Sequence, residues 1–128
     1  MLGRLRSHDR DSLRAAWWGV RAIVAGRLAL RRDPEGAGVA LPAVPPLPAR
    51  ARRGLDAVLR RSRATCLVKA SVRQAWLAAH GDARDLVIGV TAPAAGFRAH
   101  AWLAGDAEER SGEFTELARR PAPRVSTP

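Results

Sequence analysis

The sequence predicts an α+β fold in which helices are followed by a small antiparallel sheet. Apolar residues recur every three or four positions in three stretches before residue 80, which is typical of helices. Two stretches after residue 84 are either β-branched and apolar or alternating, which is typical of strands. The expected organisation is an N-terminal helix and connector over residues 1–50, a core over 51–120 and a disordered tail over 121–128.

The first predicted element is an amphipathic helix over residues 10–32, with Asp11 or Ser12 capping its start. Its apolar stripe consists of Leu13, Trp17, Val20, Val24 and Leu28. Arginines interrupt this stretch, so it is not expected to span a membrane. Residues 33–50 follow, with four prolines between Pro42 and Pro48. Proline fixes φ and lacks an N–H, so we expect an extended connector there.

The core is predicted to hold two helices and three strands. A basic helix is expected over residues 49–61, and a second over 65–79 that ends before a glycine. "DLVIGV" at 85–90 is typical of a buried strand, and "FRAHAWLAG" at 97–105 alternates as a second strand. "EFTEL" at 113–117 follows a polar stretch and predicts a third strand or extended piece.

Charge and cysteine content restrict the function classes. The net charge is +10, and all basic residues except Lys69 are arginine, which pairs with carboxylates and phosphates. Acidic peptides, anionic membrane surfaces and nucleic acids all carry such groups. No helix-turn-helix, RNP or zinc-finger pattern is present, so we expect no nucleic-acid partner, and no membrane association is expected.

The single cysteine excludes an intramolecular disulfide. The three histidines and this cysteine show no HExxH or CxxC spacing, so neither a metal nor a cofactor is expected. The charged N-terminus has no apolar segment directly behind it, so we expect no signal peptide and a cytoplasmic, reducing location.

The chemistry centres on Cys66 and His100. Cys66 falls in the first turn of the helix predicted over 65–79, where free backbone N–H groups favour a thiolate and can hold an oxyanion. His100 is the only histidine on a predicted core strand, where it can accept and return a proton. His80 ends the helix of Cys66, roughly 20 Å away at 1.5 Å per residue, and cannot be its partner. Outside such a setting, a lone cysteine is more often a buried structural residue.

The order "TCLVKASVRQAWLAAHGDARDLVIGV" and then "GFRAHAW" resembles the transglutaminase-like cysteine peptidases that remove the leader from lasso-peptide precursors. That family is related in fold to papain and the transglutaminases. The resemblance covers about residues 60–120 and implies that Cys66 and His100 are the catalytic pair. It also implies an α+β core in which the helix bearing Cys packs on a small antiparallel sheet bearing His.

The third catalytic member departs from the family pattern. The family's aspartate falls at Gly112 here, and Glu113 follows it. If the strands at 97–105 and 110–117 pair around a turn near residue 107, Glu113 comes opposite His100, whereas Asp106 stays at the turn, about 20 Å along the strand. Glu113 is therefore the favoured third member, Asp106 is the rival, and a third member could also be absent. The predicted substrate-contacting residues are Leu67, Phe97 and Trp102, although Trp102 also suits the core.

These observations predict a cysteine endopeptidase that acts through a thioester acyl-enzyme. The resemblance implies a precursor peptide as substrate, a separate small leader-recognition protein, and an ATP-dependent cyclase that acts on the product. Three alternatives stay open: an acyl transferase with the same half-reaction, a catalytically silent relative, and a basic nucleic-acid or membrane-surface binding protein in which Cys66 is inert.

Overall fold

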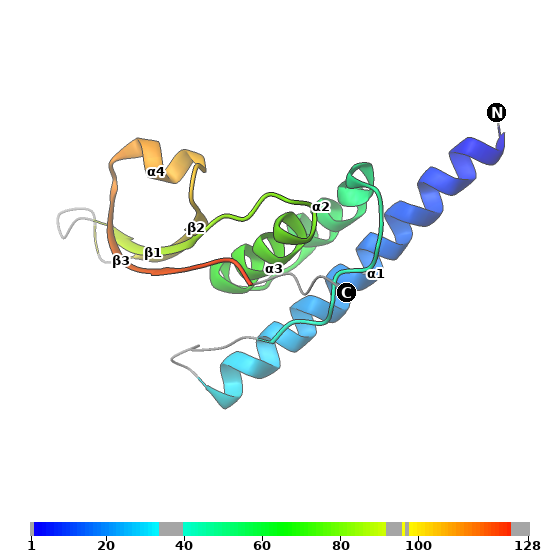
Figure 1. Ribbon diagram of the computed structural model, residues 1–128. Helices are drawn as coiled ribbons and strands as arrows, with labels where there is room; N and C mark the ends of the chain where they lie inside the picture. Colours follow the sequence, from blue (N-terminus) through cyan, green and yellow to red (C-terminus); the bar gives the residue numbers. More distant parts are fainter. Residues whose placement is uncertain (1, 34–39, 92–95, 97, 124–128) are drawn as a thin grey trace. The chain divides into compact units, whose positions relative to one another are not determined.

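The computed structural model describes residues 2–33, 40–91, 96 and 98–123, and the chain forms two compact units, Met1–Ala64 and Thr65–Pro128 (Figure 1). The boundary between the two units lies between Ala64 and Thr65, whereas the N-terminal part was expected to end at residue 50. The reason is that the helix predicted over 49–61 packs on the N-terminal helix and belongs to the first unit.

The first unit is a helical pair joined by the proline-rich connector. It consists of α1 (Leu2–Arg32), the short 3-10 helix η1 (Ala49–Ala51) and α2 (Arg52–Arg61). The apolar side chains buried in this unit include Ala15, Trp18, Ala22 and Ile23 of α1 and Leu55 and Leu59 of α2. A Cβ atom at Gly54 would lie 1.8 Å from the carbonyl oxygen of Ser12, so the glycine allows the two helix backbones to touch.

One expectation for α1 was wrong, and its apolar stripe is not its buried face. The helix begins at Leu2, so Asp11 and Ser12 lie inside it and do not cap its start. The apolar stripe is exposed, since Leu13 and Trp17 are 69% and 66% exposed. The neighbouring face is buried instead. It combines Trp18 and Ile23 with small residues such as Ala15 and Ala22.

The second unit holds the remaining elements. These are α3 (Cys66–Ala79), β1 (Leu86–Thr91), β2 (Ala99–Leu103), α4 (Ala107–Ser111) and β3 (Phe114–Arg120). The predicted helices and strands are all present, and α4 is an addition within the stretch that was expected to be a polar connection. An α+β fold with an N-terminal helix is therefore confirmed.

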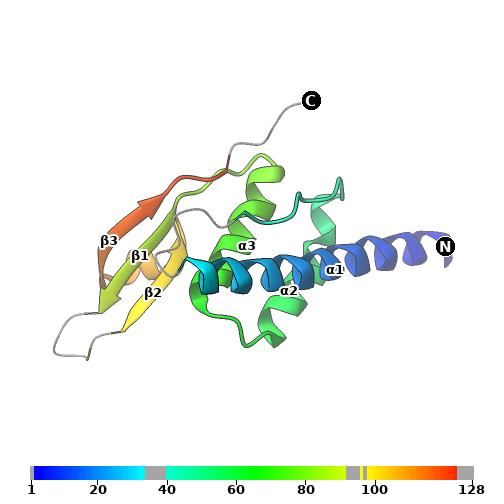
Figure 2. The ribbon, with the colours of Figure 1, turned by 90° about the horizontal axis from the view of Figure 1, so that it is seen from below.

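The strand order corrects one expectation. Figure 2 shows β1 between β2 and β3, in an antiparallel sheet of order β2-β1-β3. The hairpin expected between the second and third strands is absent from the described residues, because each of them pairs with β1. β1 is the most apolar strand, and a central position surrounds it with partners on both edges. At Gly89 the residues across are His100 on β2 and Glu116 on β3.

α3 holds the sheet through its buried face. Val68, Val72 and Trp76 are at most 2% exposed, and the helix packs against β2 and β1. The side-chain amide of Gln74, which is 93% buried, donates hydrogen bonds to the carbonyl oxygens of Arg84 (2.9 Å) and Arg120 (3.1 Å). Gln74 thereby fixes the start of β1 and the end of β3 to the same helix.

Candidate active site

Cys66 is the first residue of α3. Thr65 caps the helix, and its side-chain oxygen accepts a hydrogen bond of 3.3 Å from the Val68 N–H. The Thr65 carbonyl accepts another from the Lys69 N–H. The structure records no acceptor within the described chain for the N–H groups of Cys66 and Leu67, which face the helix start as free donors. The half-buried thiol therefore lies beside two donors that suit an oxyanion.

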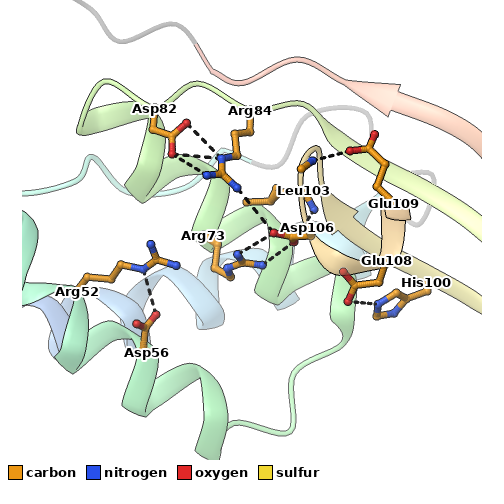
Figure 3. Close-up of polar contacts among 11 residues, drawn as sticks. Arg52, Asp56, Arg73, Asp82, Arg84, His100, Leu103, Asp106, Glu108 and Glu109 are labelled. Carbon is orange, nitrogen blue, oxygen red and sulfur yellow. Dashed lines mark hydrogen bonds and ion pairs between the residues drawn. The ribbon is translucent and has the colours of Figure 1, made fainter. Parts of the chain in front are cut away.

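His100 lies in β2, the strand against which α3 packs. Its Nε2 atom lies 3.4 Å from Oε1 of Glu108 on α4, and both side chains are about one-third exposed. Figure 3 shows Glu108 directed toward the imidazole ring. Because the carboxylate occupies Nε2, Nδ1 is the ring nitrogen left for proton transfer with a thiol. No hydrogen bond of the Cys66 thiol is recorded among the described residues.

Glu108 was not predicted. It lies on α4, which carries the chain from β2 across the sheet to β3 (Figure 1) and so returns a carboxylate to His100. The sequence signal was the acidic pair Glu108–Glu109 eight or nine residues after the histidine, but α4 was not expected as a helix.

The two predicted third members lie elsewhere. Glu113 is exposed, and its backbone N–H donates to the hydroxyl of Ser111. The Asp106 carboxylate receives two hydrogen bonds from Arg73, of 3.0 and 3.3 Å, and one of 3.0 Å from the Leu103 N–H (Figure 3). The premise that placed Glu113 opposite His100 was the hairpin that the strand order excludes. Among the described residues, no hydrogen bond or ion pair joins Glu113 or Asp106 to His100.

Asp106 is a structural anchor with a shifted pKa. Burial alone would raise the pKa of this carboxyl, but the hydrogen bonds from Arg73 and Leu103 and the charges of Arg73 and Arg84 outweigh it. The pKa of Asp106 is therefore lower than its ordinary value. The side chain is 15% exposed and ties the turn after β2 to α3.

An aromatic cluster supports His100. The imidazole lies 5.4 Å from the ring centre of Phe114 and 6.1 Å from that of Trp102, and the latter two rings are 5.2 Å apart. Trp102 crosses Gly89, where a Cβ atom would lie 2.5 Å from the indole. The ring of Trp102 is 4% exposed, and its buried Nε1 atom has no hydrogen-bond partner within the described chain.

The other predicted contact residues differ in what the structure shows of them. Leu67 is half-buried beside Cys66 at the start of α3. Phe97 lies outside the described residues. Within the described parts of the chain, no cluster of three His, Cys, Asp or Glu side chains is suited to a metal ion. None of the described helices combines the length and apolar character needed to cross a membrane.

A family model of the transglutaminase-like superfamily matches residues 11–119, so the chain belongs to this superfamily. The match extends from α1 to β3 and includes Cys66, His100 and Glu108. No curated protein and no solved structure matches the chain. Membership suggests the cysteine-based acyl-transfer chemistry of peptidases and acyltransferases.

Proposed function

We propose that this protein is a cysteine peptidase that cleaves the leader from a ribosomally made lasso-peptide precursor. The observation that carries the peptidase chemistry is the thiol at the capped start of α3. This helix packs on β2, which bears His100, and the imidazole of His100 contacts Glu108 of α4. The sequence resemblance over "TCLVKA", "LVIGV" and "HAW" supports the lasso-peptide substrate.

In the proposed reaction, the Cys66 sulfur attacks the scissile carbonyl carbon while His100 takes the thiol proton. The N–H groups of Cys66 and Leu67 stabilise the resulting oxyanion. As the C–N bond breaks, His100 returns the proton to the departing amine, and a thioester is left on Cys66. Water then attacks the thioester with His100 as base, which releases a carboxylic acid and the free thiol.

Glu108 orients the imidazole in this scheme. Its contact with Nε2 stabilises the imidazolium formed after the first proton transfer and directs Nδ1 toward the thiol. A glutamate on α4 thus takes the place that Glu113 or Asp106 was expected to fill.

The proposed partners follow from the substrate. A small leader-recognition protein holds the leader of the precursor, and an ATP-dependent cyclase closes the ring on the released product. Cytoplasmic location is part of the same proposal.

The test is mass spectrometry of a lasso-peptide precursor incubated with the protein and a leader-recognition protein, with Cys66→Ala as the matched control. A leader fragment with a free carboxylate that appears only with the unaltered protein supports the proposal. A leader amide formed with an added amine indicates an acyl transferase instead. If the precursor stays intact although leader binding is demonstrated, the peptidase proposal fails.

A further inference from the structure

The first unit exposes a row of large apolar side chains that its own fold leaves uncovered. This row, called the α1 ridge here, consists of Leu13, Trp17, Val20, Val24 and Leu28, which are between 42% and 69% exposed. The adjacent face of the same helix is buried and includes Trp18, whose indole N–H donates to the carbonyl of Pro42. Exposed apolar rows of this kind mark interaction surfaces.

The spacing of the ridge fits one partner helix. Its members are separated by four, three, four and four residues, so they cover an arc of about 80° and a length of about 22 Å at 3.6 residues per turn. An apolar row as narrow as the α1 ridge is typical of packing between two helices, whereas a helix that lies on a lipid surface presents a wide apolar face.

The charges beside the α1 ridge indicate which kind of partner it can bind. Arg10, Arg14 and Arg21 follow one side by helical geometry and Arg27 the other; all four are exposed, and no ion pair is recorded for them in the described chain. The whole first unit holds 14 arginines against 5 acidic residues, a net charge of +9, while the second unit has a net charge of +1. A second copy would bring arginine against arginine, so the ridge is complementary to an acidic partner.

A groove adjoins the ridge at Leu13. It lies between α1 and α2, has a volume of about 510 Å³, and is lined by apolar and small residues together with a few polar ones. The lining includes Leu13, Ala16, Gly54, Ala57 and Val58, together with Asp9, Ser12 and Arg61. A helix docked on the α1 ridge can place one of its side chains in this groove. A flat lipid surface has no such side chain to fill it.

We propose that the α1 ridge binds an acidic amphipathic helix of a partner protein. The apolar side of that helix lies on the ridge with one large side chain in the groove, and its carboxylates pair with the flanking arginines. This inference concerns the first unit and does not depend on the proposed peptidase activity.

The experiment uses two synthetic helical peptides of matched apolar spacing, one flanked by glutamates and the other by lysines. Binding of each fluorescently labelled peptide to the full chain is followed by anisotropy. The glutamate peptide is expected to bind at least tenfold more tightly than the lysine peptide, and its binding is expected to weaken as salt is added.

Three variants give the controls. Trp17→Gln/Val24→Gln should weaken binding of the glutamate peptide at least tenfold, because both residues are in the ridge and exposed. Leu117→Gln removes an equally exposed apolar residue of β3 and should leave binding unchanged. Arg14→Glu/Arg21→Glu should reverse the preference toward the lysine peptide. Circular dichroism of each variant checks that the helices are retained.

Three results would overturn the proposal. The first is equal or absent binding of the two peptides to the unaltered chain. The second is binding to phosphatidylglycerol vesicles that depends on the ridge when the glutamate peptide does not bind, which assigns the ridge to a membrane surface. The third is a dimer in sedimentation analysis that dissociates in Trp17→Gln/Val24→Gln, which assigns it to a second copy.

Discussion

At the scale of single residues, the contact between His100 and Glu108 gives the sharpest prediction. Glu108→Gln keeps the size of the side chain but removes the charge that stabilises an imidazolium at 3.4 Å. We expect kcat/KM for the precursor to fall by about 10²-fold, with a changed pH profile, because the pair is partly exposed and orienting acids contribute at most about 10⁴-fold. Glu113→Gln is the matched control and should leave both quantities unchanged. Loss of activity in Glu113→Gln alone would contradict the assignment.

Gly89 supports a second prediction at this scale. In Gly89→Ala, the new Cβ atom would lie 2.5 Å from the Trp102 indole and 2.9 Å from the carbonyl oxygen of Thr115. Such overpacking is expected to lower the free energy of unfolding by about 1–3 kcal/mol, measured by urea denaturation. In a Trp102→Phe background the ring is smaller, so Gly89→Ala should lower the free energy of unfolding by less. Equal costs in both backgrounds would show that the indole is not the obstacle.

At the scale of elements, the cap of α3 can be tested directly. Thr65→Ala removes the acceptor of the Val68 N–H, so we expect the free energy of unfolding to fall by about 0.5–2 kcal/mol. Thr65→Ser retains the hydroxyl, so its free energy of unfolding should fall much less. Thermal melts of both variants beside the unaltered protein provide the comparison, and equal losses would exclude a role for the hydroxyl.

The turn from β2 into α4 gives a prediction about pH. The pKa of Asp106 is lower in the folded chain than in the unfolded one, so its stabilising effect is present above about pH 4 and is lost as pH falls through the folded value. Asp106→Asn should therefore lower the free energy of unfolding by about 1–3 kcal/mol at pH 7. The difference from the unaltered protein should become smaller as the pH is lowered. Asp82→Asn, at a more exposed carboxylate, is the control. A difference between Asp106→Asn and the unaltered protein that stays constant down to pH 2.5 would argue against this account.

The sequence was informative where its patterns are local. The helix after Thr65 was predicted because residues recur at helical spacing before a glycine stop, and the strand from Leu86 because β-branched residues cluster there. α4 was missed because a helix of five residues is too short to show periodicity. The cap of α1 was misplaced because the apolar periodicity begins at Leu13, whereas the helix begins at Leu2.

At the scale of the whole molecule, the strand order could not be predicted from neighbouring segments. β2 and β3 are close in sequence, and a local hairpin was the simplest expectation, but both pair with β1. The candidate site depends on that order, because α4 has to cross from one edge of the sheet to the other and brings Glu108 to His100 on the way. Residue type and spacing predicted Cys66 and His100 as the catalytic pair, which stays a prediction, whereas the contact of Glu108 with His100 was not predicted.

The charge difference between the two units predicts their response to salt. The first unit has a net charge of +9 and the second of +1, so screening should relieve self-repulsion mainly in the first. Raising NaCl from 0.05 to 0.5 M shortens the Debye length to about 4 Å. This change is expected to slow amide hydrogen exchange in α1 and α2. Exchange in β1 should change little. An equal effect on both units would show that net charge does not limit the stability of the first.

The central position of β1 also has a consequence for biosynthesis. As the ribosome makes the chain, β1 and β2 emerge close together and can pair early, but the second edge of β1 stays open until Phe114–Arg120 has left the exit tunnel. An open edge on an apolar strand is a template for pairing with other nascent chains. Truncated translation products that stop before β3 should therefore aggregate, and the last strand serves as the protective cover of the sheet.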